Sequence, residues 1–355
     1  MKKIVFTGGG SAGHVTPNIA IMDQLDQTEW DISYIGSHNG IEKELIGRTS
    51  IPYEAISSGK LRRYIDLQNA TDAFRVMKGI FDARKVLKKH KPDLVFSKGG
   101  FVTVPVVIAA SSLKIPVFLH ESDLTPGLAN KLAQRFTTKI FTSFDEAAAH
   151  FPSSKTKAIG SPIRKELFEG NAKQGLDFLG FHSSIPVLTV MGGSLGAKSI
   201  NDAVREALPE LLSRFQIVHL CGKGHLDPSL DHHTGYKQFE YVHDELSDIL
   251  AATNYVVTRG GSNAIFEFLA LKKPMLIIPL SRAQSRGDQI LNANSFEKKG
   301  YSLTLEEEDL SKETILNQLI KLKENEHTFK QKMINSQETD AISMILTEMN
   351  AHISS

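Results

Sequence analysis

The sequence predicts an α/β protein with two doubly wound parallel sheets. Short apolar runs alternate with helical patterns along the chain, which is typical of parallel sheets covered by helices on both faces. A strand, a glycine-rich turn and a helix start follow one another twice, near residue 4 and near residue 187. The length of 355 residues exceeds what one hydrophobic core usually supports, so we expect two domains.

The strand-like runs are short, largely apolar and mostly followed by a turn or a helical pattern. They lie at residues 4–7, 32–35, 94–97, 117–120, 139–142, 187–191, 216–220, 255–258 and 275–279. From residue 311 onward the pattern is helical and highly charged. The acidic run at 306–309, which precedes this segment, is expected to be solvated.

We expect three parts in the chain: an N-terminal Rossmann-like domain over 1–161, a C-terminal one over 162–335, and a helix over 336–355 that packs back on the first domain. Glycine and proline at 160–162, followed by the glycines between 170 and 180, indicate a hinge between the halves.

Composition excludes several classes. Hydrophobic residues make up 41% and charged residues 23%, as in ordinary globular proteins. A net charge of +1 gives no overall attraction to nucleic acid. The single cysteine, Cys221, excludes an internal disulfide and a cysteine metal cluster, and fits a reducing compartment. No signal peptide is expected, and no apolar run reaches the roughly 18–20 residues of a membrane span.

The first glycine loop also fits a second class. Gly8, Gly10 and Gly13 match the dinucleotide fingerprint, so an NAD-dependent oxidoreductase is an alternative. That fingerprint expects an acidic residue at the end of the second strand, whereas residues 34–39 contain none. His14 follows the loop directly. A helix N-terminus favours the neutral imidazole, which accepts a proton as a general base does.

The motifs become specific as an ordered set. They are GGGSAGHVxP from residue 8, SKGGF from 97, HExxxxPGxxNK from 120, GxPIR from 160, GGSxGA from 192 with Asn201, RxG from 259 with Glu267, and DQxxNA from 288. Within residues 4–294 this set resembles glycosyltransferase family 28, the MurG family of bacterial UDP-N-acetylglucosamine transferases in peptidoglycan synthesis.

The resemblance implies the GT-B fold, in which two Rossmann-like domains face each other across a cleft. The first domain would bind a lipid-linked acceptor and the second UDP-N-acetylglucosamine (UDP-GlcNAc). The implied reaction moves N-acetylglucosamine to the 4-hydroxyl of the muramic acid in undecaprenyl-linked lipid I, with inversion, and gives lipid II.

The resemblance also implies roles for single residues. His14 is the catalytic base or positions the acceptor, Arg164 and Ser194 lie near the diphosphate, Glu267 holds the ribose and Val242 reads the uracil edge. The full substrate-binding set is Ser11, Ala12, Gly13, Asp123, Arg164, Ser194, Val242, Ser262, Asn263, Glu267, Gln289 and Asn292. The acceptor-binding set is Gly99, Gly100 and Asn130.

Some positions depart from the family pattern. Ser11-Ala12 stands where Thr-Gly is usual, Asp123 where Asn is frequent, and Gly287-Asp288 where a first Gln often precedes Gln289. No Asp-x-Asp ends a strand, and the neighbours His232 and His233 would point about 100° apart on a helix. We therefore expect no essential metal and no cofactor besides the substrate, with Arg164 and a helix dipole facing the diphosphate charge.

A helix expected at 71–89 has two apolar stripes. One packs on the sheet and consists of Val76, Ile80, Ala83 and Leu87. The other faces outward and interleaves with bases, in the set Phe74, Met77, Phe81, Lys78, Arg84, Lys85 and Lys88. Aromatic side chains among bases suit an anionic membrane surface, and the basic residues at 60–63 support that interpretation. A wide core stripe is the alternative.

The partners expected are thus UDP-GlcNAc, undecaprenyl-linked lipid I, an anionic membrane surface and other cell-wall enzymes, with no nucleic acid. The expected location is the cytoplasmic face of the cell membrane, held peripherally. A UDP-GlcNAc 2-epimerase of the same fold remains an alternative, as do the NAD-dependent oxidoreductase and a non-catalytic nucleotide-sugar sensor.

Overall fold

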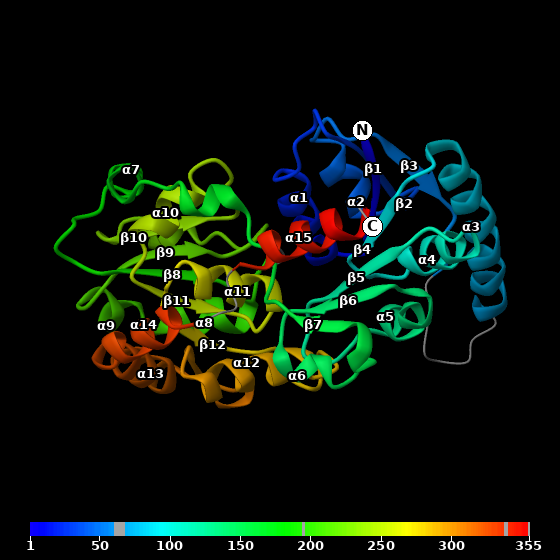
Figure 1. The fold of residues 1–355 in the computed structure, drawn as a ribbon. Helices are drawn as coiled ribbons and strands as arrows, with labels where there is room; N and C mark the ends of the chain where they lie inside the picture. Colours follow the sequence, from blue (N-terminus) through cyan, green and yellow to red (C-terminus); the bar gives the residue numbers. More distant parts are fainter. Residues whose placement is uncertain (60–67, 194–195, 337–339, 354–355) are drawn as a thin grey trace. The chain divides into compact units, whose positions relative to one another are not determined.

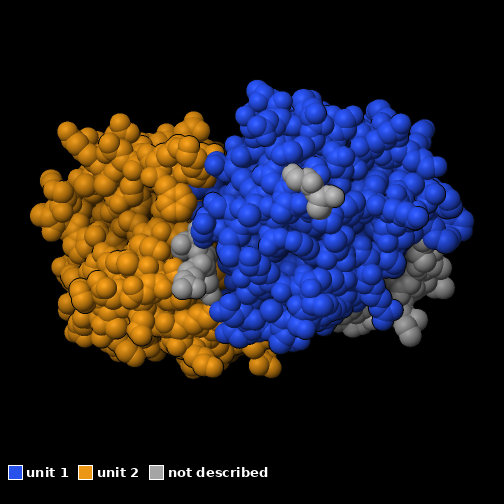
Figure 2. Space-filling view, in the orientation of Figure 1, with its two compact units in different colours: residues 1–164, 337–355 blue, residues 165–336 orange. Residues whose placement is uncertain are grey.

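The computed structural model describes residues 1–355 except 60–67, 194–195, 337–339 and 354–355. The chain divides into two compact units, shown in different colours in Figure 2. Unit 1 consists of residues 1–164 and 337–355, and unit 2 of residues 165–336. Each unit has its own sheet and core.

Unit 1 is built on a seven-stranded sheet in the order β3-β2-β1-β4-β5-β6-β7, in which every pairing is parallel (Figure 1). The first strand therefore lies inside the sheet, and the direction of winding reverses between β1 and β4, where such sheets bind ligands. The strands are β1 Lys2–Thr7, β2 Trp30–Ser37, β3 Tyr53–Ile56, β4 Leu94–Ser97, β5 Val117–Glu121, β6 Lys139–Thr142 and β7 Thr156–Ala158.

Helices cover both faces of this sheet because successive strand side chains point to opposite faces. Ile4 and Phe6 belong to the core on one face, and Val5 to the core on the other. The helices are α1 Thr16–Met22, α2 Ile41–Ile46, α3 Gln68–His90, α4 Thr103–Ser112, α5 Leu128–Ala133, α6 Asp145–Ala148 and α15 Ala341–Ile353.

The last helix, α15, belongs to unit 1 although unit 2 precedes it in the chain (Figure 1). Ala341, Ile345 and Met349 recur at every fourth position and are buried in the core that contains Phe6. Glu348 pairs with Lys139 and Lys157 of the sheet. This apolar face and these charges place the helix on the sheet of unit 1.

Unit 2 repeats the plan with a six-stranded parallel sheet in the order β10-β9-β8-β11-β12-β13. Its strands are β8 Val187–Met191, β9 Gln216–Leu220, β10 Tyr236–Phe239, β11 Tyr255–Thr258, β12 Met275–Ile277 and β13 Ser302–Thr304. Its helices are α7 Ala172–Leu179, α8 Lys198–Glu206, α9 Leu208–Leu212, α10 Leu246–Ala252, α11 Ser262–Ala270, α12 Asp288–Lys299, α13 Lys312–Glu324 and α14 Glu326–Ile334. Two parallel Rossmann-like sheets confirm the predicted fold class.

The structure also corrects details. The sequence did not reveal β3, β7, β10 and β13, which are three or four residues long and have little apolar periodicity. The glycines between 170 and 180 do not form a hinge: a Cβ on Gly170 or Gly175 would overlap the backbone of 247–248, so they let α7 lie close to α10. No described helix combines the length and apolar character needed to cross a bilayer.

Candidate functional site

Two glycine loops meet at the carboxyl edge of the unit 1 sheet, after β1 and β4. The N–H of Gly9 donates to the carbonyl of Gly99 at 3.3 Å. Gly100 has a left-handed backbone with φ of +89°, and a Cβ there would overlap the carbonyl of Gly9. Glycine is therefore required by both conformation and space. The hydroxyl of Tyr34 also donates to the carbonyl of Gly8, at 2.8 Å.

The buried carboxylate of Glu42, on α2, accepts hydrogen bonds that hold the first loop. It accepts the N–H of Gly10 at 3.1 Å, and the N–H and hydroxyl of Ser37 at 3.0 and 2.5 Å. Its residue is only 1% exposed. A Cβ on Gly9 would lie 2.5 Å from its carboxyl carbon, and one on Gly40 would overlap it. The carboxylate thus occupies the position under the loop that only glycines leave open.

The loop fixes the chemical state of His14. Its Nδ1 lies 3.1 Å from the carbonyl oxygen of Gly9 and 3.1 Å from the hydroxyl of Ser11. A carbonyl oxygen only accepts hydrogen bonds, so this contact favours the tautomer with the proton on Nδ1, in which Nε2 is the basic nitrogen. The predicted residues Ser11, Ala12, Gly13 and His14 therefore present one imidazole nitrogen that can accept a proton.

The second glycine loop follows a buried polar cluster. Lys98 donates from its ammonium nitrogen to Nδ1 of His120 at 2.6 Å and to the hydroxyl of Ser122. Nε2 of His120 donates in turn to the carbonyl of Gly160, at 3.0 Å. This chain of contacts ties the end of β4 to the end of β5 and to the segment that leads to Arg164.

Burial controls the charges of that cluster. It lowers the pKa of Lys98 to about 7, against the opposing charges of Glu121 and Asp123. It also lowers the pKa of His120 well below its usual value, and the neighbouring Lys98 adds to this. Burial raises the pKa of Glu121, which accepts from Nδ2 of Asn130 at 2.8 Å. His120 is consequently a neutral acceptor for Lys98.

The structure brings most predicted residues of unit 1 together at this edge. Asn130 is buried, and a Cβ on Gly99 would lie 3.0 Å from its side-chain oxygen. The N–H of Asp123 donates to Glu121 at 3.0 Å. Arg164 is half-buried and ends the N-terminal part of this unit.

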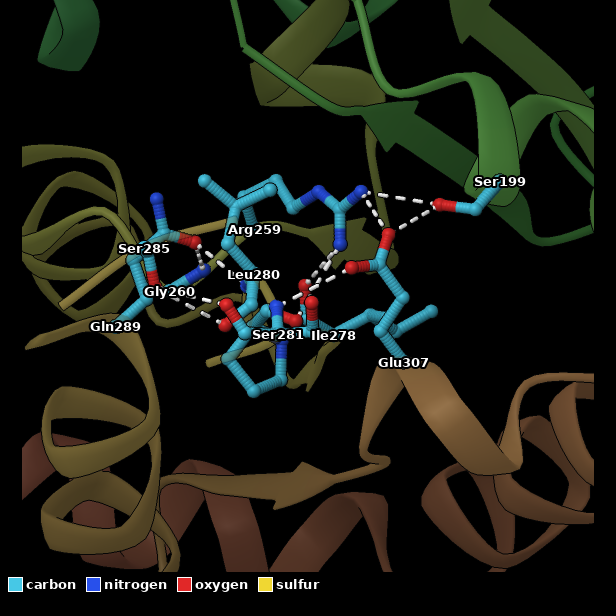
Figure 3. Close-up of polar contacts among 10 residues, drawn as sticks. Ser199, Arg259, Gly260, Ile278, Leu280, Ser281, Ser285, Gln289 and Glu307 are labelled. Carbon is cyan, nitrogen blue, oxygen red and sulfur yellow. Dashed lines mark hydrogen bonds and ion pairs between the residues drawn. The ribbon is translucent and has the colours of Figure 1, made fainter. Parts of the chain in front are cut away.

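At the carboxyl edge of the unit 2 sheet, Gln289 contacts the segments that follow β11 and β12 (Figure 3). The side-chain oxygen of Gln289 accepts the N–H groups of Gly260 and Leu280, at 3.2 and 3.0 Å. Nδ2 of Asn292 donates to the carbonyl of Gly260 at 3.1 Å. These two side chains from α12 thus hold the turn before α11, so Gln289 has a structural role that the sequence did not indicate.

An ion pair braces the same edge. The guanidinium of Arg259 lies 2.5 Å from the carboxylate of Glu307, and both side chains are nearly buried. Ser199 contacts both groups, and Arg259 also donates to the carbonyls of Ile278 and Pro279. The expectation that the run 306–309 is solvated is therefore wrong for Glu307, because a buried guanidinium needs its charge balanced.

The remaining predicted residues of unit 2 lie on two different elements. Ser262, Asn263 and Glu267 lie on α11, which begins after the turn held by Gln289. Val242 follows β10 and packs against the apolar core that includes residues of α7 and α10. Ser194 lies outside the described residues.

The histidine pair differs from expectation. His232 and His233 lie in a turn rather than on a helix, with ring centroids 4.2 Å apart. Within the described ranges, no group of three or more His, Cys, Asp or Glu residues is arranged to hold a metal ion.

Sequence reasoning missed several residues that shape both edges. Glu42 does not lie at the end of the second strand, where the dinucleotide fingerprint expects an acid, but in the first turn of the next helix. The motifs contain Lys98 and His120 but do not indicate that their side chains are in contact. Both residues lie at the carboxyl ends of parallel strands, and that location is the sequence signal that could have identified them as site residues.

Two family models match the chain. The Glycosyltransferase family 28 N-terminal domain matches residues 4–142, and the Glycosyltransferase family 28 C-terminal domain matches residues 187–345. Curated relatives match along their whole length. One from Shouchella clausii is 60% identical over 99% of this chain and 100% of its own, and one from Bacillus cereus is 59% identical over 99% of each.

Both relatives are named UDP-N-acetylglucosamine--N-acetylmuramyl-(pentapeptide) pyrophosphoryl-undecaprenol N-acetylglucosamine transferase, the Bacillus cereus one with the number 2. Among solved structures, Acinetobacter baumannii MurG superposes with a TM-score of 0.77 at 22% identity, over 99% of this chain and 100% of that one. A putative UDP-N-acetylglucosamine 2-epimerase from Listeria monocytogenes gives a TM-score of 0.69 at 15% identity, over 99% and 97%. At such identities these two structures share the fold.

Together these matches define the class: the protein is a glycosyltransferase with two Rossmann-like domains. It belongs to glycosyltransferase family 28.

The buried Lys98 predicts a pH effect on stability. Its pKa is lowered from 10.5 to about 7, so between these values the unfolded chain binds a proton that the folded protein does not. The group then makes the free energy of unfolding rise with pH, by up to about 1.4 kcal/mol per unit. We expect urea denaturation of Lys98→Met to show a shallower rise between about pH 8 and 10. Exposed Lys131→Met should keep the wild-type slope, and equal slopes for Lys98→Met and wild type would contradict the burial argument.

Proposed function

We propose that this protein transfers N-acetylglucosamine from UDP-GlcNAc to the 4-hydroxyl of the muramic acid of lipid I, with inversion, and so forms lipid II for peptidoglycan synthesis. The observation that carries the proposal is the imidazole of His14 at the edge of a sheet in a family 28 glycosyltransferase, with its Nδ1 against the carbonyl of Gly9 and its Nε2 as the proposed base. Curated relatives with this activity in their names match the whole chain at about 60% identity.

The chemistry divides between the two units. In unit 1, Nε2 of His14 takes the proton of the attacking hydroxyl, whose oxygen forms the new bond to the anomeric carbon of the sugar. The bond from that carbon to the diphosphate breaks, and UDP leaves with the electron pair. Attack from the face opposite the leaving group inverts the anomeric carbon.

We assign the predicted residues of unit 2 to the binding of the donor substrate, UDP-GlcNAc. Glu267 holds the ribose hydroxyls, and the turn fixed by Gln289 and Asn292 faces the sugar and diphosphate. Arg164 supplies the donors that phosphate oxygens need. The proposal includes no cofactor besides the substrate and no essential metal, because no Asp-x-Asp ends a strand in the sequence.

The alternatives fit less well. In an NAD-dependent enzyme the N–H groups of the first glycine loop face a pyrophosphate, but here the N–H of Gly10 already donates to the carboxylate of Glu42. Two solved structures named as 2-epimerases share the fold at 15% and 14% identity, whereas the curated relatives named as transferases match at about 60%. The transferase is therefore the better-supported function.

The proposed location is the cytoplasmic face of the cell membrane, held peripherally by α3. Phe74 and Phe81 are 72% and 73% exposed and Met77 is 51% exposed, while Ala83 and Leu87 on the opposite stripe are fully buried. These exposures support a helix that packs one stripe on the core and presents the other to a membrane. The bases proposed to contact anionic lipid are Arg84, Lys85 and Lys88; other cell-wall enzymes are proposed partners at that surface.

Removal of the proposed base tests the reaction. His14→Ala should lower transfer of labelled N-acetylglucosamine to a lipid I analogue by about 10²–10⁴-fold, the range typical of a lost general base. Binding of UDP, measured by calorimetry, should remain at the wild-type level. The exposed His150→Ala is the matched control. Wild-type transfer by His14→Ala would overturn the assignment, and epimerisation of UDP-GlcNAc without acceptor would favour the epimerase.

The membrane contact has its own test. The double variant Phe74→Ser/Phe81→Ser should bind phosphatidylglycerol vesicles at least tenfold more weakly than wild type in sedimentation, since each exposed aromatic side chain gains roughly 1.5–3 kcal/mol on burial. Phe168→Ser, at a 53% exposed site in unit 2, is the control. Equal binding of wild type to neutral phosphatidylcholine vesicles, or full binding by the double variant, would contradict the proposal.

A further inference from the structure

Unit 1 contains a cavity of about 970 Å³ beside the first glycine loop. Its walls come from that loop, from the segment between β2 and α2, from the end of β3 and from the first half of α3. The residues that line it are Gly10, Ser37, His38, Asn39, Gly40, Ile41, Ile56, Ser57, Ser58, Asp72, Arg75, Lys78 and Phe101. The substrate-binding and acceptor-binding sets predicted from the sequence do not include any of these, whereas Lys78 belongs to the predicted membrane-facing set.

The walls combine polar side chains with the apolar Ile41, Ile56 and Phe101, and they carry two cations. Serine hydroxyls and the amide of Asn39 offer both donors and acceptors. Arg75 lies 3.4 Å from Asp72, whose charge it partly balances, whereas Lys78 forms no ion pair with a described residue. Such a wall suits a hydrophilic ligand with a negative group and amide bonds. A hydrocarbon chain alone would offer these cations no partner.

The cavity shares its wall with the catalytic loop. Gly10 and Ser37 line the cavity and are the two residues that the carboxylate of Glu42 holds. Gly10 is four positions before His14 in the sequence. A ligand in the cavity therefore lies beside the loop that positions the base, where the substrate with the attacking hydroxyl is proposed to bind.

The names of the relatives give the parts of that substrate: a muramyl sugar with a pentapeptide, a pyrophosphoryl group and undecaprenol. Undecaprenol is a hydrocarbon, and the exposed Phe74, Met77 and Phe81 on α3 suit it better than a cavity with two cations does. A diphosphate is compact, whereas the cavity reaches the upper end of the range of about 300–1,000 Å³ typical of ligand sites. The pentapeptide supplies amides, length and a carboxylate.

We propose that this cavity binds the peptide of the acceptor, with a peptide carboxylate held by Lys78 and Arg75. The proposal rests on the proposed function and extends it. Lys78 and Arg75 then select acceptors with a peptide, and the peptide, bound against Gly10, sets the position of the sugar relative to His14. These residues bind and position the substrate without taking part in bond making.

Steady-state kinetics with two acceptors in detergent micelles tests the proposal: lipid I, and the same muramyl diphosphate lipid without peptide. Lys78→Ala and Arg75→Ala should each raise KM for lipid I about tenfold, the usual effect of losing one charge-assisted hydrogen bond. KM for the peptide-free acceptor should equal that of wild type. Lys78→Arg should restore affinity, and Lys43→Ala, an exposed lysine outside the cavity, should match wild type.

A direct binding measurement separates this proposal from the proposed function. Soluble muramyl pentapeptide, without diphosphate or lipid, should bind to wild type and to Lys43→Ala, with about tenfold weaker binding to Lys78→Ala in NMR titration. Binding of that kind by a wild type that transfers no sugar would support the cavity and refute the reaction. Equal KM increases for both acceptors would assign the cations to the diphosphate, and unchanged KM values or equal peptide binding would also overturn the proposal.

Discussion

The hydrogen bond between the carboxylate of Glu42 and the N–H of Gly10 is the contact on which the unit 1 site depends. A buried carboxylate with no cationic partner among the described residues is stable only where several donors converge on it, and here the donors come from the loop and from Ser37. Gly9, Gly36 and Gly40 have no side chain because a Cβ at each would come too close to Glu42. The glycines at these positions, the backbone conformation of the loop and the position of the Glu42 side chain therefore depend on one another.

The position of His14 follows from this constraint. The carbonyl of Gly9 fixes its Nδ1 proton, and the N–H of Gly9 joins the loop to Gly99. Next to Gly99, the buried hydrogen bonds of Lys98 and His120 anchor the start of the second loop to the ends of neighbouring strands. Unit 2 achieves the same rigidity differently, with an ion pair between Arg259 and Glu307 and with amide side chains from α12. Both sheets therefore present a defined backbone at their carboxyl edges.

The sequence predicted the fold class and the family correctly because both depend on strong, repeated signals: apolar strands, glycine turns and ordered motifs. Edge strands such as β3 and β13 were missed because three or four residues carry too little periodicity. Long-range polar partners were missed for another reason. Glu307 appears in a run of four acidic residues, and only the three-dimensional structure shows that it alone reaches Arg259. The structural role of Gln289 is similar, since its partners Gly260 and Leu280 are distant in sequence.

The central claim is that Glu42 holds the loop that carries the base. Hydrogen exchange at the amide of Gly10, measured together with kcat, tests it most directly in Glu42→Ala and in the exposed control Glu44→Ala. Loss of a buried charged acceptor removes about 1.5–3 kcal/mol of hydrogen bonding, so we predict exchange at least tenfold faster and kcat at least tenfold lower in Glu42→Ala, with UDP affinity unchanged. Wild-type exchange and kcat in a folded Glu42→Ala protein would contradict this account.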